Sequence, residues 1–446
     1  MYTNNSDDHP AHGGDRLPFI VALLLLVVLN LHTLRNLSSI YLGAPLALYL
    51  FSAALCQTSV FPFARTPNAT GGLLPDVRRL YYLYLFATVY VTTISPFWVE
   101  LDEVLIAVPR LWFTLPFALV VMASVNKESH VRVLLLTYIT LVAVGCLSVP
   151  FQLVFAPISW FHEASARASL ERYASLFGNL TAVGIVGAIG LIAVLMLHMH
   201  VLLRLTLACA ICLGLLCSLQ KAAVVNLLLV PFVYLLFSRQ RVTQRASRLL
   251  LTFGFILLII AYLTVADERF GHHGEYLLSK IAGDDVISRP ATVDDPSLSA
   301  SMSDRLSNYV PQMLEENGPM SVLFGAGARG LAGTVGLPQY TMAHTTYGDV
   351  LFAGGFLFAL LLIALQVQLF RAFWTLATLA HHTHNEMMQN NVDTILAMLV
   401  VVYVNCLGNS GMLIQPNEST VFYMSIGLAM GWYHKRAARL SCIRNK

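Results

Sequence analysis

Apolar residues recur along this chain in runs that are too long for the core of a soluble domain. A hydrocarbon core about 30 Å thick is crossed by a helix of about 17 to 25 predominantly apolar residues. Runs of about this length follow one another from end to end, and they predict an all-α polytopic membrane protein with about twelve transmembrane helices. The predicted spans are 17–33, 38–60, 80–99, 104–124, 132–155, 180–200, 203–219, 222–238, 248–265, 348–370, 393–411 and 418–434.

Composition and charge support this fold class and suggest an orientation. Apolar residues make up 57% of the 446 residues and charged residues 11%, whereas roughly 25% of residues in soluble domains are charged. If both termini are cytoplasmic, seventeen of the 27 Lys and Arg residues lie on the cytoplasmic side, nine lie on the opposite side, and Arg110 lies inside a span. This bias predicts cytoplasmic termini. We expect Arg110 to face a polar cavity or a helix partner, because a charge in lipid is costly.

The first apolar run is predicted to remain as a span. Its leader carries Asp7 and Asp8 where a cleavable signal would carry basic residues.

One segment, 266–347, interrupts the alternation of predicted spans and short turns. It divides the chain into a first membrane part (1–265), an external loop (266–347) and a second membrane part with a cytoplasmic tail (348–446). A loop of about 80 residues is expected to carry local structure or a binding element.

Part of this loop has the pattern of a short amphipathic helix. Ser303 can cap it, apolar residues recur at i, i+3, i+4, i+7 and i+8 from Leu306, and Gly318-Pro319 ends it. Arg305, near the start, is expected to point toward whatever this helix covers.

The stretch GAGARG at 325–330 satisfies G-x-G-x-x-G. It lacks the strand, helix and acidic residue that give this motif its dinucleotide meaning. We interpret it as a glycine-rich turn, which can still offer backbone N–H groups to an anion.

Basic residues and one histidine are expected on the external face. Arg172, Lys221 and Arg305, with Arg289, lie where the positive-inside rule would deplete charge. Each alone is compatible with a side chain that lifts its charge to the membrane surface. Together they suit an anionic lipid-linked group, because the guanidinium fork matches pyrophosphate. His344, at the boundary of the span 348–370, is a candidate general base.

The order of these features resembles the O-antigen ligase and polymerase family of bacterial envelope glycosyltransferases. The resemblance runs from about residue 165 to 370 and rests on Arg172 with Gly178-Asn179, a basic residue near 220, one long loop with Ser301 to Arg305, a glycine-rich segment, His344 with Tyr347, and Gly354-Gly355-Phe356. Two positions depart from the family's pattern: Lys221 stands where an arginine is common, and Thr345 where an asparagine is common.

The resemblance implies a GT-C-like helical fold with one long periplasmic loop, in a multi-pass protein of the bacterial inner membrane. It implies a metal-independent, inverting glycosyltransferase without a cofactor, whose partners are a glycan on undecaprenyl pyrophosphate, an acceptor glycolipid and a possible chain-length regulator, and not nucleic acid. In this interpretation Arg172, Lys221, Arg305 and Arg289 bind the pyrophosphate, Arg305 also stabilises the leaving charge, and His344 deprotonates the acceptor hydroxyl.

Three functions stay open on the sequence. A polymerase would use another lipid-linked repeat unit as acceptor, a ligase would use the lipid A-core, and a flippase or transporter would only move the lipid-linked glycan. The departures from ligase-like signatures favour the polymerase, and the gathering of charges at one face disfavours a transporter, which needs polar residues near the bilayer midplane.

Overall fold

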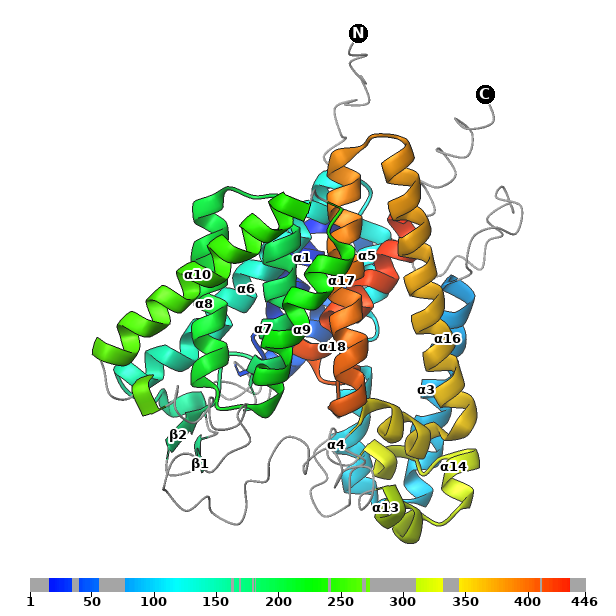
Figure 1. Ribbon diagram of the computed structural model, residues 1–446. Coiled ribbons are helices and arrows are strands. Elements are labelled where there is room, and N and C mark those ends of the chain that lie inside the picture. The colour runs from blue at the N-terminus through cyan, green and yellow to red at the C-terminus, as the bar shows by residue number, and fades with distance from the viewer. Residues whose placement is uncertain are drawn as a thin grey trace.

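The computed structural model is a bundle of helices with one small β-hairpin (Figure 1). It describes residues 16–33, 40–55, 77–161, 164–167, 170–178, 180, 182–239, 242–266, 270–272, 310–331, 345–409 and 411–433.

The first half of the chain forms most of the bundle. Its elements are α1 (Arg16–Asn30), α2 (Ile40–Leu55), α3 (Val77–Ile94) with the 3₁₀ turn η3 (Ser95–Phe97), α4 (Leu101–Trp112), α5 (Phe117–Ser124), α6 (Glu128–Val154), η4 (Ser159–Phe161), the strands β1 (Ala164–Arg167) and β2 (Leu170–Tyr173), α7 (Ala182–Met196), α8 (Val201–Cys217), α9 (Lys221–Phe237) and α10 (Val242–Ala266).

The second half adds short helices at one end and three long segments. They are α13 (Val310–Asn317), α14 (Met320–Phe324), the 3₁₀ helix η6 (Gly327–Leu331), α16 (Thr346–His382), α17 (Glu386–Gly408) and α18 (Pro416–Leu428), which continues as the π-helix η7 (Ala429–Tyr433). In Figure 1, β1, β2, α13 and α14 lie at the lower end of the bundle, and the turn between α16 and α17 lies at the upper end.

The predicted class, a helical membrane protein, agrees with this fold. Within the described residues, six helices are long and apolar enough to cross a membrane: 77–97, 101–124, 128–154, 242–259, 346–382 and 386–408. Five further apolar helices have only 10–17 residues. Each predicted span overlaps a helix, but the number twelve stays a prediction.

The core of the bundle is α7, in which every residue is buried. Its sequence, AVGIVGAIGLIAVLM, is apolar on all sides, as expected for a helix that is surrounded by others. A methyl group added at Gly187 would lie 2.9 Å from Leu215 of α8, and one at Gly190 would lie 2.5 Å from Val142 of α6. Small residues therefore let the helix backbones approach closely.

The predicted span 348–370 is not one straight helix. Gly355 adopts φ 76° and ψ −176° and breaks α16 into a short arm, 346–354, and a long arm, 356–382. A Cβ at this position would clash with the backbone oxygen of Leu323 in α14. The apolar pattern missed this kink because it depends on a contact with the loop segment.

The predicted span 104–124 is also divided, into α4 and α5, at residues 113–116. Arg110 consequently lies in the last turn of α4, where its side chain is exposed. The expectation that Arg110 faces a polar cavity or a helix partner stays a prediction. Proline at 116, the N-cap of α5, is consistent with a helix start there.

The described part of the long loop packs beneath the short arm of α16. Buried Met313 of α13 packs against Phe352, and Ala326 N donates to Phe352 O at 2.6 Å. Ala328 N donates to Ser95 Oγ at 2.8 Å. The GAGARG stretch, predicted as a glycine-rich turn, is mostly the 3₁₀ helix η6, and these two N–H groups bind the protein's own oxygens.

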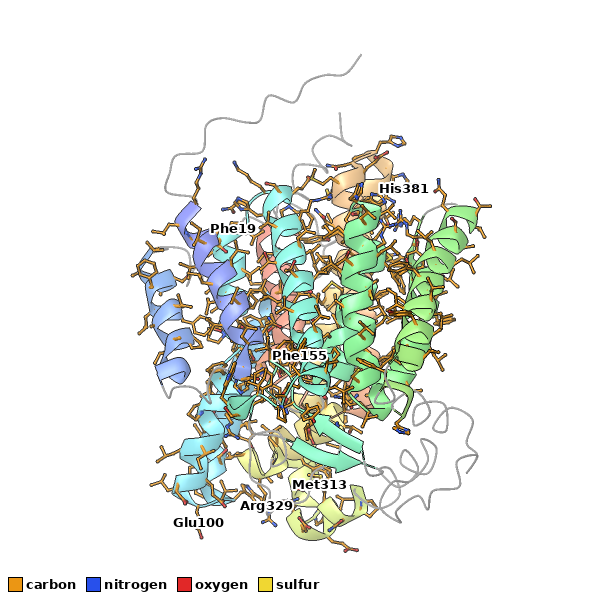
Figure 2. All side chains as sticks on the ribbon, turned by 90° about the vertical axis from the view of Figure 1, so that its left-hand side faces the viewer. Phe19, Glu100, Phe155, Met313, Arg329 and His381 are labelled. Carbon is orange, nitrogen blue, oxygen red and sulfur yellow. The ribbon has the colours of Figure 1, made fainter. Side chains whose placement is uncertain are left out.

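Figure 2 shows Glu100, Met313 and Arg329 at the end of the bundle opposite His381. Helix α13 corresponds to the last part of the helix predicted from Ser303, and it ends before Gly318, as predicted. Residues 301–309, including Ser303 and Arg305, lie outside the described residues.

Candidate functional site

Arg172 connects the β-hairpin to the lower ends of α7 and α8. It lies in β2, opposite Ser165 of β1. Its Nε donates to Ser218 O at 3.1 Å and its Nη2 to Leu180 O at 3.0 Å. Ser218 is the C-cap of α8, so the guanidinium satisfies a carbonyl at the negative end of that helix.

The turn between α8 and α9 is strained and polar. Leu219 has φ 52°, a left-handed conformation that costs a non-glycine residue about 1 to 3 kcal/mol. The next residue, Gln220, is 3% exposed. Its Oε1 accepts from Gly184 N in the first turn of α7 at 2.7 Å, and its Nε2 donates to Leu180 O. Gln220 therefore caps α7 and shares an acceptor with Arg172.

A row of asparagines continues from α9 to α17. Asn226 donates to Gly184 O at 2.8 Å and exchanges side-chain hydrogen bonds with Asn405. Asn409, one turn beyond Asn405, donates to Asn405 O at 3.2 Å. Thr346, the first residue of α16, donates to Asn409 O at 2.7 Å.

These contacts form one continuous set, which we call the polar layer. Its members are Arg172, Gln220, Asn226, Asn405, Asn409 and Thr346. It joins the lower ends of five helices from two separate parts of the chain, α7 to α9 and α16 to α17.

Helix polarity in this region favours negative charge. Four helices, α7, α9, α16 and α18, begin at this end of the bundle, and the start of a helix carries partial positive charge. The ends of α8 and α17 also lie here, but the carbonyls of Ser218 and Asn409 accept from Arg172 and Thr346. The arrangement can therefore hold the oxygens of an anion or of sugar hydroxyl groups.

Two carboxylates are buried beside the layer. Glu418, in the first turn of α18, and Asp349, in the short arm of α16, are each 1% exposed. Asn417, which precedes Glu418, donates to Phe177 O at 2.9 Å and so joins the start of α18 to the segment before α7.

That segment turns at Gly178, which has φ 93°. A Cβ there would lie 3.1 Å from Thr33 N, so the position requires glycine on two counts, conformation and space. These two requirements explain the glycine of the Gly178-Asn179 pair.

The predicted site residues are only partly described. Arg172 is the one whose side chain is placed. Lys221 is the first residue of α9, so its backbone follows Gln220 directly, but its side chain lies outside the described part, as do Arg289, Arg305 and His344. Thr345, next to His344, is the N-cap of α16 and accepts from Gly348 N at 3.0 Å.

Sequence reasoning missed most of the layer. Asn405 and Asn409 stand one helical turn apart at the end of an apolar span, and buried amides in spans mark interhelical contacts. That spacing was the available signal. Gln220 and Asn226 gave no comparable signal, because each is a single polar residue at a helix start.

The fold and the layer define an all-α membrane protein with a buried polar layer at one end of its bundle. No protein-family model matches this chain, and no curated protein matches its sequence.

Proposed function

We propose that this protein is a membrane glycosyltransferase that moves a glycan from undecaprenyl pyrophosphate to an acceptor sugar at the periplasmic face of the bacterial inner membrane. The proposed activity is that of an O-antigen or polysaccharide polymerase of the O-antigen ligase and polymerase family. Both chain ends would lie in the cytoplasm, in a fold of about twelve spans and GT-C type.

One observation carries this proposal. Hydrogen bonds run without a break from Arg172, through the turn that precedes Lys221, to Thr346, two residues after His344. The proposed anion ligand Arg172 thus belongs to the layer, and the layer ends two residues along the chain from the proposed base, His344. The side chains of the polar layer lie at one end of the bundle, which fits an enzyme at a membrane surface better than a transporter with a midplane site.

In the proposed reaction the acceptor hydroxyl attacks the anomeric carbon in line with the pyrophosphate. The new carbon–oxygen bond forms as the bond to the pyrophosphate oxygen breaks, and the configuration inverts. The hydroxyl proton passes to His344, and the negative charge stays on undecaprenyl pyrophosphate. Arg172, Lys221, Arg305 and Arg289 stabilise that charge.

The test is expression in a strain that lacks its own polymerase, with lipopolysaccharide and lipid-linked glycans analysed by gel and mass spectrometry. A ladder of chain lengths is expected from the native protein, and loss of the ladder from Arg305→Ala and His344→Ala. Arg110→Ala, at an exposed arginine outside the layer, is the matched control.

Other outcomes assign other functions. Transfer of preformed chains to the lipid A-core would identify a ligase. Lipid-linked glycan that changes sides without being joined would identify a flippase. Full activity of both alanine variants would remove the proposed catalytic roles.

A further inference from the structure

A groove lies between α16 and α17, and one end of it adjoins the polar layer, because Tyr347 follows Thr346 in α16 and Leu407 lies between Asn405 and Asn409 in α17. The two helices meet at the upper turn and diverge toward the lower end (Figure 1). The groove has a volume of about 500 Å³, within the ~300 to 1,000 Å³ that is typical of small-molecule sites. Its walls are Tyr347, Ile363, Gln366, Val367, Phe370, Arg371, Tyr403 and Leu407.

The back of the groove is closed by hydrogen bonds. Tyr347, from the short arm of α16, donates to Gln366 Oε1 at 2.8 Å, and Tyr403 of α17 donates to Gln366 O at 3.1 Å. Because these hydroxyl groups are engaged with Gln366, the wall is mainly hydrocarbon. Ile363, Val367 and Leu407 are 44%, 50% and 61% exposed, so the groove opens sideways to the membrane.

Among the described residues that line the groove, Arg371 alone is charged, and it lies at one end. Arg371 is exposed, and it forms no ion pair with any residue in the described ranges. A lipid-facing cation without a neighbouring carboxylate leaves positive charge to be neutralised by a ligand.

Neighbouring residues place Arg371 close to the membrane surface. Trp374, one turn away, is 50% exposed and stacks on Phe370 with 6.0 Å between ring centroids. Tryptophan is enriched at membrane–water interfaces. Arg239 donates to Ala377 O at 3.3 Å and forms an ion pair with Asp393 at 3.4 Å. A long arginine side chain one turn inside this level reaches the lipid phosphates.

We propose that the groove binds one anionic phospholipid of the adjacent leaflet. Its phosphate lies at Arg371, and one acyl chain runs along Phe370, Val367 and Ile363 toward Tyr347. The position of Arg371 favours a phospholipid over the lipid carrier. An isoprenoid pyrophosphate that serves the polar layer would need its pyrophosphate at the opposite end of the groove, near Tyr347. The bound chain fills the space where α16 and α17 diverge, and its binding is independent of glycosyl transfer.

Phosphatidylglycerol with a diazirine in one acyl chain tests the site in nanodiscs of the full-length protein. Crosslinked peptides are expected from α16 and α17 at the groove. Ile363→Trp, which fills the groove, should lower this labelling on the order of tenfold, as should Arg371→Gln, which removes a charged hydrogen-bond donor. Native mass spectrometry, in parallel, measures the phospholipid that stays bound to each variant.

Two matched variants control for folding and for general charge. Leu360→Trp places the same side chain at a residue of α16 that is 45% exposed and not part of the groove. Arg16→Gln removes an exposed arginine from the start of α1. Both should leave the labelling unchanged.

Three results would overturn the proposal. They are equal labelling by a phosphatidylcholine probe, unchanged labelling of Arg371→Gln, and displacement of the phospholipid by an isoprenoid pyrophosphate that itself labels the groove. The last would assign the groove to the lipid carrier. If the native protein proves to have no polymerase activity, the expected labelling of the groove should still be seen. The two proposals can therefore fail separately.

Discussion

Asn226 of α9 and Asn405 of α17 each donate a side-chain N–H to the other's side-chain oxygen, at 3.1 and 2.9 Å. They are 1% and 5% exposed. Neither helix can slide along the other without breaking both hydrogen bonds. The pair thus holds the end of α17, and through Asn409 the start of α16, in register with α9.

Replacing one asparagine of this pair should destabilise the protein. Asn226→Leu or Asn405→Leu leaves the remaining amide without its partner in a buried place. Polar contacts between membrane helices couple by about 0.6 kcal/mol, up to about 1.7. A double-mutant cycle, followed by thermal unfolding in detergent, should give a coupling free energy in this range. Strictly additive single-variant effects would contradict the contact.

Arg172→Ala should abolish the proposed transfer and also weaken the fold. The substitution leaves Ser218 O and Leu180 O without these donors. We expect a loss of activity of about 100-fold or more, as for removal of a charge-stabilising donor. Arg172→Lys keeps the charge but cannot donate two parallel hydrogen bonds as a guanidinium does. Its activity should therefore lie between those of the native protein and Arg172→Ala.

A readout besides activity separates the two roles of Arg172. If the side chain were only structural, Arg172→Lys would lower thermal stability and activity together. If it binds pyrophosphate, binding of an isoprenoid pyrophosphate probe should fall more steeply than stability does. Arg110→Ala should change neither.

Gly355→Ala should disrupt the kink of α16. A side chain there meets the backbone of α14, and a backbone at φ 76° and ψ −176° costs a residue other than glycine about 1 to 3 kcal/mol. We expect lower folded yield and lower thermal stability, because the short arm would separate from α14. Gly254→Ala, in α10, adds a methyl group into open space and should be neutral or stabilising.

We expect His198, at the upper end of the bundle, to make the stability of the protein depend on pH. Partial burial, and then the charges of Arg248, Arg204 and Arg132, lower the pKa of His198 below 6.5, against an opposing effect of Glu386. The folded protein therefore prefers neutral His198. Its contribution to stability is complete above about pH 6.5 and declines as the pH falls from there toward the lower folded pKa.

Thermal unfolding between pH 5 and 8 measures this effect. His198→Gln should flatten the acid limb of the profile. His200→Gln, at the second histidine of the same turn, is the matched control variant. An unchanged acid limb in His198→Gln would contradict the assignment.

The candidate site was predictable only in outline. Arg172 stands out as a basic residue at the edge of a span, and the structure joins it to the turn before Lys221. Its actual acceptors, two backbone oxygens, carry no sequence signal. Lys221, Arg289, Arg305 and His344 keep the status of predictions, since their side chains lie outside the described residues.

The sequence by itself determined that this chain is helical and belongs in lipid, because hydrophobicity along about 20 residues is a local property that decides where a segment partitions. It also indicated where most of the helices lie. Only the tertiary structure decided the break at Gly355, the pairing of Asn226 with Asn405 and the acceptors of Arg172. Each depends on groups that are distant in the chain and meet only when helices pack, so no local pattern can specify them.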